Sequence, residues 1–85
     1  MALNVSVVSA ERQVWAGEAS QVIAKTVEGE IGILSGHEPL LALLAKGEVR
    51  VTTAGGDKVA VEAEGGFLSV DHDTITIVAG NATVA

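Results

Sequence analysis

The side chains most capable of chemistry stand in the run Asp71-His72-Asp73, where two carboxylates flank an imidazole. Carboxylates and imidazoles are common metal ligands, so this run could contribute to a metal site. Adjacent residues of a strand or turn point in divergent directions, however, and the chain lacks a third group of ligands to complete the site. Asp is also frequent in turns. The run therefore predicts a solvated turn, and we expect no metal.

Other catalytic or ligand-binding patterns are weak. Gly29 and Gly32 suggest a phosphate-binding loop, but both the G-x-G-x-x-G spacing and a terminal Gly-Lys-Ser/Thr before a helix are missing. The serines have no His and acidic partners in a nucleophile-elbow context. Cysteine is absent, which excludes disulfides and thiolate sites. We expect neither catalytic residues nor a cofactor.

Residues 28–44 combine glycines with polar side chains in a way that suits a contact surface better than a pocket. The glycines allow sharp turns or the close approach of a neighbouring backbone. His37 lies among them in Gly36-His37-Glu38-Pro39, and two interpretations stay open for it: an exposed loop residue, or a contact with a partner protein.

The chain has 85 residues, and we expect one domain over residues 1–85. A domain of this size buries only about 60–65% of the surface that its unfolded chain exposes, so its core must be dense in aliphatic side chains. Hydrophobic residues make up 48% of the chain, yet only Trp15 and Phe67 are aromatic, so Val, Ile, Leu and Ala must fill the core.

The formal net charge of −6 argues against binding to nucleic acid or to anionic lipid. The longest apolar run, residues 39–45, is far shorter than the roughly 20 residues that span a bilayer. No basic region precedes an apolar stretch at the N-terminus, so no signal peptide is visible. We therefore expect a soluble intracellular protein.

Alternation of apolar and polar residues predicts strands along most of the chain. The predicted strands cover residues 3–7, 13–16, 21–27, 47–54, 58–63, 67–70, 74–79 and 82–84. Residues 55–57, Gly-Gly-Asp, favour a tight hairpin, and further turns are predicted at residues 64–66 and 71–73. The pattern leaves open which face of residues 21–27 is buried.

The apolar run of residues 40–44 is the one segment whose residues favour a helix, but Pro39 before it and Gly47 after it leave room for barely two turns. We interpret the run as a strand or an irregular apolar segment, and the glycine-rich stretch before it as loop-like. Many short strands without a helical period predict an all-β fold, an antiparallel sandwich or barrel.

Five motifs follow one another along the chain. They are Val7-Val8-Ser9-Ala10-Glu11, Trp15-Ala16-Gly17, Glu28-Gly29-Glu30-Ile31-Gly32-Ile33, Gly36-His37-Glu38-Pro39-Leu40-Leu41 and Gly65-Gly66-Phe67-Leu68-Ser69-Val70. In this order they resemble the epsilon subunit of the F-type ATP synthase over residues 3–79. Trp15 and the last motif are most similar to actinobacterial members of that family.

The resemblance implies an antiparallel β-sandwich of about ten strands in two packed layers. In this family the domain has no catalytic residues. It joins the gamma subunit to the c-ring at the foot of the central stalk, so that proton-driven rotation of the ring turns gamma and drives ATP synthesis. The implied partners are thus gamma and the c-ring. The implied location is the cytoplasmic side of the cell membrane, to which the subunit attaches only through the complex. The isolated subunit is expected to be a monomer.

By position, the resemblance also implies contact residues. Those facing the c-ring are Glu28, Gly29 and Glu30. Those contacting gamma are Ser9, His37 and Ala42. Carboxylates suit the first role because they can pair with basic and amide groups of a polar loop.

The chain departs from the family pattern in two places, and these departures limit what the resemblance implies. Ser35 stands where the family commonly has proline before Gly-His, which loosens that turn. The helical hairpin that usually follows the sandwich does not occur before the sequence ends at Ala85. In relatives that hairpin inhibits ATP hydrolysis or binds ATP, so the resemblance implies neither property here.

Two other hypotheses stay open at this point. A small β-sandwich could bind a nucleotide or metal near His37, Glu38 or residues 71–73, and would then be stabilised by that ligand. A scaffold could instead self-assemble through an edge strand and form concentration-dependent oligomers.

Overall fold

The computed structural model describes residues 3–9, 12–36 and 38–84. This part of the chain forms nine strands. The strands are β1 (Leu3–Ser9), β2 (Gln13–Thr26), β3 (Gly29–Leu34), β4 (Leu40–Leu43), β5 (Gly47–Thr53), β6 (Lys58–Glu64), β7 (Phe67–Asp71), β8 (Thr74–Ala79) and β9 (Asn81–Val84). Among these residues no helix is long and apolar enough to cross a bilayer.

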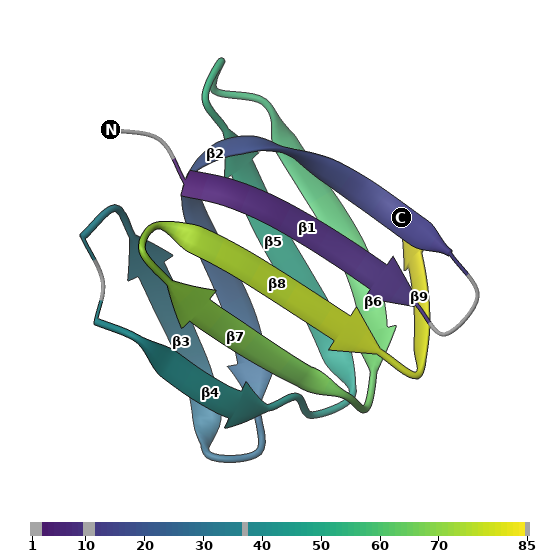
Figure 1. Cartoon of the computed structure of the whole chain (residues 1–85). Helices are drawn as coiled ribbons and strands as arrows, with labels where there is room; N and C mark the ends of the chain where they lie inside the picture. Colours follow the sequence, from purple (N-terminus) through teal and green to yellow (C-terminus); the bar gives the residue numbers. More distant parts are fainter. Residues whose placement is uncertain (1–2, 10–11, 37, 85) are drawn as a thin grey trace.

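The strands lie in two layers (Figure 1). The front layer has the order β4-β7-β8-β1, and the back layer contains β3, β2, β5, β6 and β9. β2 is 14 residues long and serves both layers, because its first half pairs with β1 and its second half lies between β3 and β5. A register shift between Ala19 and Gln21, where β2 faces β5, marks the passage from one layer to the other.

The predicted all-β fold is confirmed, with nine strands instead of about ten. Residues 13–16 and 21–27, predicted as two strands, form the single strand β2. Gly17 does not end the strand. Its lack of a side chain instead leaves space for the indole of Trp15. A Cβ at Gly17 would lie 3.1 Å from two carbons of that ring.

The prediction of a loop-like glycine-rich stretch is wrong for residues 29–34, which form β3. Ile33 is buried and Ile31 half-buried, while Glu30 and Gly32 are exposed, so the residues alternate as in any strand with one covered face. Among the described strands, one pair departs from the antiparallel arrangement, because β1 and β8 run parallel. Their pairing joins segments far apart in the sequence, and local alternation carries no information about its direction.

Aliphatic side chains from both layers meet in one core, as the composition predicts. Val22 and Ala24 of β2 are buried, which settles the covered face of that strand. The largest fully buried side chains are Leu3, Val7, Val22, Ile33, Val49, Val51, Val61, Leu68, Val70, Ile75 and Ile77. The apolar run of residues 40–44 begins with β4 and ends at the buried Leu44.

Turn chemistry follows the sequence closely. The hairpin predicted at residues 55–57 joins β5 to β6, and Gly56 has a positive φ of 93°. In the turn between β7 and β8, His72 and Asp73 both have positive φ, at 48° and 59°, which is the geometry of a type I′ hairpin. Gly66, between β6 and β7, has a φ of 94° and lies against the backbone of Val78.

Replacing Gly66 with alanine should lower the free energy of unfolding by about 2–4 kcal/mol, because the new Cβ would both require an unfavourable φ and overlap the carbonyl group of Val78. Gly56→Ala is the matched control. Its φ is nearly the same, but no atom lies within 4 Å of the added Cβ, so it should cost only about 1 kcal/mol. Equal losses in urea denaturation would contradict the assigned packing at Gly66.

Candidate partner-binding surface

The Asp71-His72-Asp73 turn, considered above for metal binding, divides into two parts with different surroundings. His72 is 92% exposed, and its Nε2 lies 3.4 Å from Asp71 Oδ1. These two side chains therefore match the predicted solvated turn. Across the described ranges, the structure brings together no group of three or more His, Cys, Asp or Glu side chains that could hold a metal ion.

Asp73 instead ties two distant loops together. Its Oδ1 accepts a hydrogen bond from the Gly36 N–H at 2.7 Å, and its Oδ2 accepts one from the Ser35 hydroxyl at 3.3 Å. Its own carbonyl accepts from the N–H of Asn4 at 2.8 Å. The serine that departs from the family pattern thus adds a polar contact to this turn, immediately before His37.

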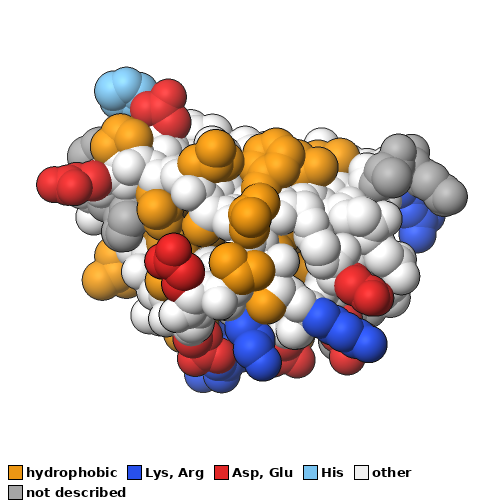
Figure 2. Space-filling view, turned by 90° about the horizontal axis from the view of Figure 1, so that it is seen from below, with side chains coloured by type: hydrophobic (Ala, Val, Ile, Leu, Met, Phe, Trp, Pro, Cys, Tyr) orange, Lys and Arg blue, Asp and Glu red, His pale blue; other side chains and the backbone are white. Residues whose placement is uncertain are grey.

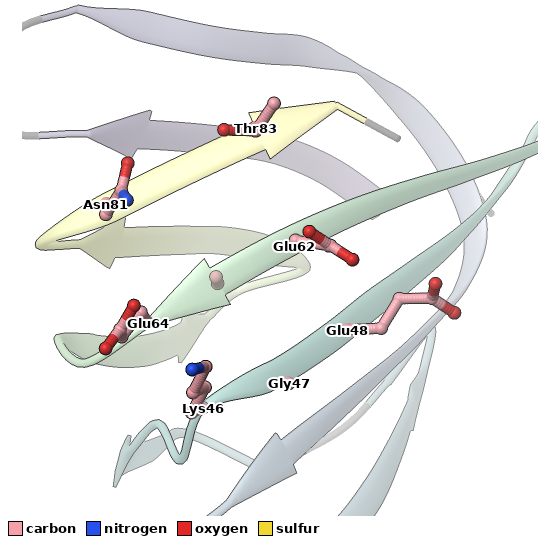
Figure 3. A pocket seen from close by; sticks show the side chains of 8 residues that line it. Lys46, Gly47, Glu48, Glu62, Glu64, Asn81 and Thr83 are labelled. Atoms are coloured by element: carbon pink, nitrogen blue, oxygen red, sulfur yellow. The ribbon is translucent and has the colours of Figure 1, made fainter.

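A depression on the back layer is the other candidate for ligand binding (Figure 3). Its lining residues come from β5, β6 and β9 and the approach to β5, and include Lys46, Glu48, Glu62, Glu64 and Asn81. The labelled carboxylates of Glu48, Glu62 and Glu64 do not converge on a common point in Figure 3. This arrangement resembles a solvated charged sheet face and gives no support to a bound nucleotide.

The turn between β2 and β3 forms an exposed acidic tip, made of Glu28, Gly29 and Glu30. Thr26 holds the turn from inside: its buried hydroxyl donates to the Gly29 carbonyl at 2.7 Å and accepts from the Glu28 N–H at 3.2 Å. Gly29 has a φ of 127°, which favours glycine at this position. The two hydrogen bonds and the conformation of Gly29 therefore define the backbone geometry of the tip.

The two carboxylates of the acidic tip have different surroundings. Glu30 Oε2 accepts a hydrogen bond from Nη2 of Arg50 at 3.1 Å, and Arg50 Nε lies 3.8 Å from Glu48 Oε1. These side chains are about half exposed, so the network adds little to stability. It does share the charge of Glu30 with a cation, whereas Glu28 makes no ion pair within the described residues.

An apolar patch crosses the outer face of the front layer, and it consists of Val8, Val27, Leu41, Leu43, Phe67 and Val78. Leu43 pairs with Phe67, Phe67 with Val78, and Val78 with Val8, so these four side chains form a row on one face of the sheet. Val27 joins the row from the acidic tip, because its N–H donates to the Leu43 carbonyl at 3.0 Å.

Exposure distinguishes this patch from the core. Leu41 is 71% exposed, Leu43 and Val27 are each 63% exposed, and Phe67 is 38% exposed. In Figure 2 hydrophobic side chains gather along one side and the middle of the molecule, most Lys and Arg side chains lie along the opposite side, and carboxylates occur on both. Contiguous apolar side chains at a surface are typical of a protein-binding site.

Ser9 and Ala42, two of the residues expected to contact gamma, lie in strands that carry this patch, but they pair with the buried Ala79 and Leu68, so their side chains point to the opposite face of the sheet. Ser9 directly follows Val8 at one end of the row, where its N–H and hydroxyl both donate to the Arg12 carbonyl, at 2.8 and 3.1 Å. Ala42 lies in β4 at the other end, half-buried and paired with Leu68, with the exposed leucines on either side of it. His37 lies outside the described residues.

Leu41, Leu43 and Phe67 are the candidate contact residues that the sequence did not reveal. Every residue of β4 is apolar, so the strand lacks the alternation of apolar and polar residues that marks an outward face. The signal that was available is the spacing of Leu41 and Leu43, which alternate with Leu40 and Ala42.

Comparison with known proteins gives a consistent result. Residues 2–85 match the family model described as "ATP synthase, Delta/Epsilon chain, beta-sandwich domain". The chain is 58% identical over 80 residues to the ATP synthase epsilon chain of Micrococcus luteus, covering 94% of this chain and 88% of that protein. It is 51% identical over 78 residues to the epsilon chain of Corynebacterium diphtheriae, covering 91% of this chain and 63% of that one.

A solved structure has a fold similar to that of the present chain. A chain of the mitochondrial ATP synthase of Euglena gracilis, in an assembly described as OSCP/F1/c-ring, superposes with a TM-score of 0.91 at 26% sequence identity. The match covers 98% of this chain and 53% of the Euglena chain, so the present sequence spans about half of the latter.

Replacing Asp73 with alanine should loosen the turn at Ser35 and Gly36, because a hydrogen bond to a charged acceptor is worth about 1.5–3 kcal/mol. Amide hydrogen exchange at Gly36 should accelerate by roughly tenfold to a hundredfold. Asp71→Asn is the control, since the Asp71 carboxylate contacts His72 and not the turn. Unchanged exchange at Gly36 in the alanine variant would show that the contact is not formed in solution.

Proposed function

The chain belongs to the ATP synthase delta/epsilon chain family, and we propose that it acts as the epsilon subunit of the rotor, joining the gamma subunit to the c-ring in the central stalk. In this role the subunit is not catalytic: it transmits torque through surface contacts, and ATP is made elsewhere in the complex. It attaches to the cytoplasmic side of the cell membrane only through that complex.

The family match over residues 2–85 is the observation that carries this proposal. The Euglena chain of the same shape was solved in an assembly that contains both F1 and a c-ring. The surface of the present chain suits such a position, because it offers an apolar patch and an acidic tip side by side. The chain can therefore contact two neighbours of different chemistry at once, one through each surface.

The apolar patch is proposed to bind the gamma subunit. Stable protein interfaces contain a dry core of apolar and aromatic side chains, and Phe67, Leu41 and Leu43 offer this chemistry on the outer face of the sheet. Ser9, Ala42 and His37 are proposed to lie at the edges of the same contact.

The acidic tip is proposed to face the polar loops of the c-ring. Its carboxylates can attract basic and amide groups, and such contacts weaken as salt screens them. Because Arg50 already shares the charge of Glu30, Glu28 is the more available of the two carboxylates. We therefore assign the larger share of ring contact to Glu28.

Leu43→Asp should weaken binding to the gamma subunit by about thirtyfold or more, since charge in the dry centre of an interface costs about 2 kcal/mol or more. The fold should be unaffected because the Leu43 side chain is 63% exposed. Ala54→Asp, in the exposed turn between β5 and β6, is the control and should bind normally. Isothermal calorimetry with purified gamma measures both affinities. If the wild-type chain and gamma form no complex at micromolar concentrations, the proposed function is wrong.

Glu28→Gln should weaken association with a gamma and c-ring subcomplex at low ionic strength, and the difference from wild type should shrink as salt is added. Glu30→Gln should have a smaller effect because Arg50 already shares the charge of Glu30. Sedimentation of the subcomplex at two salt concentrations provides the measurement. An effect of Glu30→Gln larger than that of Glu28→Gln would contradict the proposed division of roles.

A further inference from the structure

β3 is an edge strand of the back layer. It pairs with β2 from Gly29 to Leu34, and no other described strand lies along its second side. Edge strands present unpaired backbone groups that can bind another extended chain. The residues of β3 whose N–H and C=O groups point away from β2 therefore determine which hydrogen bonds this edge can make with another strand.

The register fixes which backbone groups of β3 face outwards. The Lys25 carbonyl accepts from the Ala45 N–H at 3.0 Å, on the side of β2 that faces away from β3. In an antiparallel ladder the hydrogen-bonded and non-hydrogen-bonded pairs alternate, so Lys25 and Glu30 form a non-hydrogen-bonded pair. Glu30, Gly32 and Leu34 consequently direct their N–H and C=O groups towards the free edge.

These three residues are also accessible. Glu30, Gly32 and Leu34 are all exposed, and Leu34 is 58% exposed. No described atom lies within 4 Å of the position that a Cβ on Gly32 would take, so the outer face beside the centre of the edge is open. None of the three takes part in the backbone hydrogen bonds that link the described turns and loops.

The two ends of the free edge differ in chemistry. The acidic tip, with Glu28 and Glu30, lies at the start of β3, and the exposed Leu34 lies at its end. A strand spans about 3.3 Å per residue, so the carboxylate of Glu30 and the side chain of Leu34 stand about 13 Å apart along the edge. A strand complementary to this edge carries a basic residue near one end and an apolar residue four positions away.

We propose that the free edge of β3 binds an extended segment of a c-ring subunit as an additional strand, with a basic side chain against Glu28 and Glu30 and an apolar side chain against Leu34. The choice of neighbour rests on the proposed function. The edge begins at the acidic tip and is therefore continuous with the surface assigned to the c-ring. A second copy of the chain fits less well, because each copy carries a net charge of −6 and the two repel each other.

Gly32→Pro tests the added strand directly. Proline removes the N–H that faces the free edge but leaves the β2 ladder intact, since Gly32 does not hydrogen-bond to β2. We expect affinity for a gamma and c-ring subcomplex to fall by about tenfold or more, because main-chain bonds supply the affinity of an added strand. Gly32→Ala keeps the N–H and points its methyl group into open space, so it should bind like wild type.

A second variant separates loss of the edge donor from misfolding. Chemical synthesis of the 85-residue chain with N-methylglycine at position 32 removes the same donor without a ring. If both variants keep the wild-type melting temperature and still bind the subcomplex normally, the proposal is overturned. If the wild-type chain itself does not bind, the proposed function fails instead. A wild-type dimer on sizing that the N-methyl variant abolishes would assign the edge to a second copy and overturn the choice of partner.

Discussion

Hydrogen bonding along β2 connects the two layers of the sandwich. One continuous strand pairs with β1 in its first half and with β3 and β5 in its second half, so it holds the two layers in one relative position. Its end, at Thr26, leads directly into the acidic tip. The orientation of that tip relative to the sandwich is therefore set by the backbone of the strand that carries it.

Aliphatic side chains have two roles in this small protein. Most of them, such as Ile33 and Leu68, fill the space between the layers, where burial of apolar surface stabilises the fold. Others, including Leu41 and Leu43, lie on the outer face of the front layer, where they stay largely exposed to solvent. The sheet makes this possible, because successive residues of a strand point to opposite faces.

A subunit that transmits torque must resist deformation more than it must move. The features around the proposed contact surfaces are consistent with that requirement: the buried Thr26 hydroxyl closes the acidic tip, and the Asp73 carboxylate anchors the turn before His37. Both are short hydrogen bonds that fix loop backbone to the sandwich, the first within one turn and the second between two loops far apart in the sequence. Function here follows from a surface held in place and from the chemistry of its neighbours.

The all-β class, the aliphatic core and the hairpin at residues 55–57 could be predicted from the sequence, because they depend on composition, local alternation and the backbone preferences of glycine. The role of the acidic residues at the tip is expected from the family resemblance. Three features could be read only from the folded structure: the parallel pairing of β1 with β8, the bond between Asp73 and Gly36, and the side chains of β4 that face water. Each of these joins or orients residues through contacts between segments far apart in the chain. A local sequence pattern does not specify such contacts, since any strand with a suitable alternation of apolar and polar residues could have formed them.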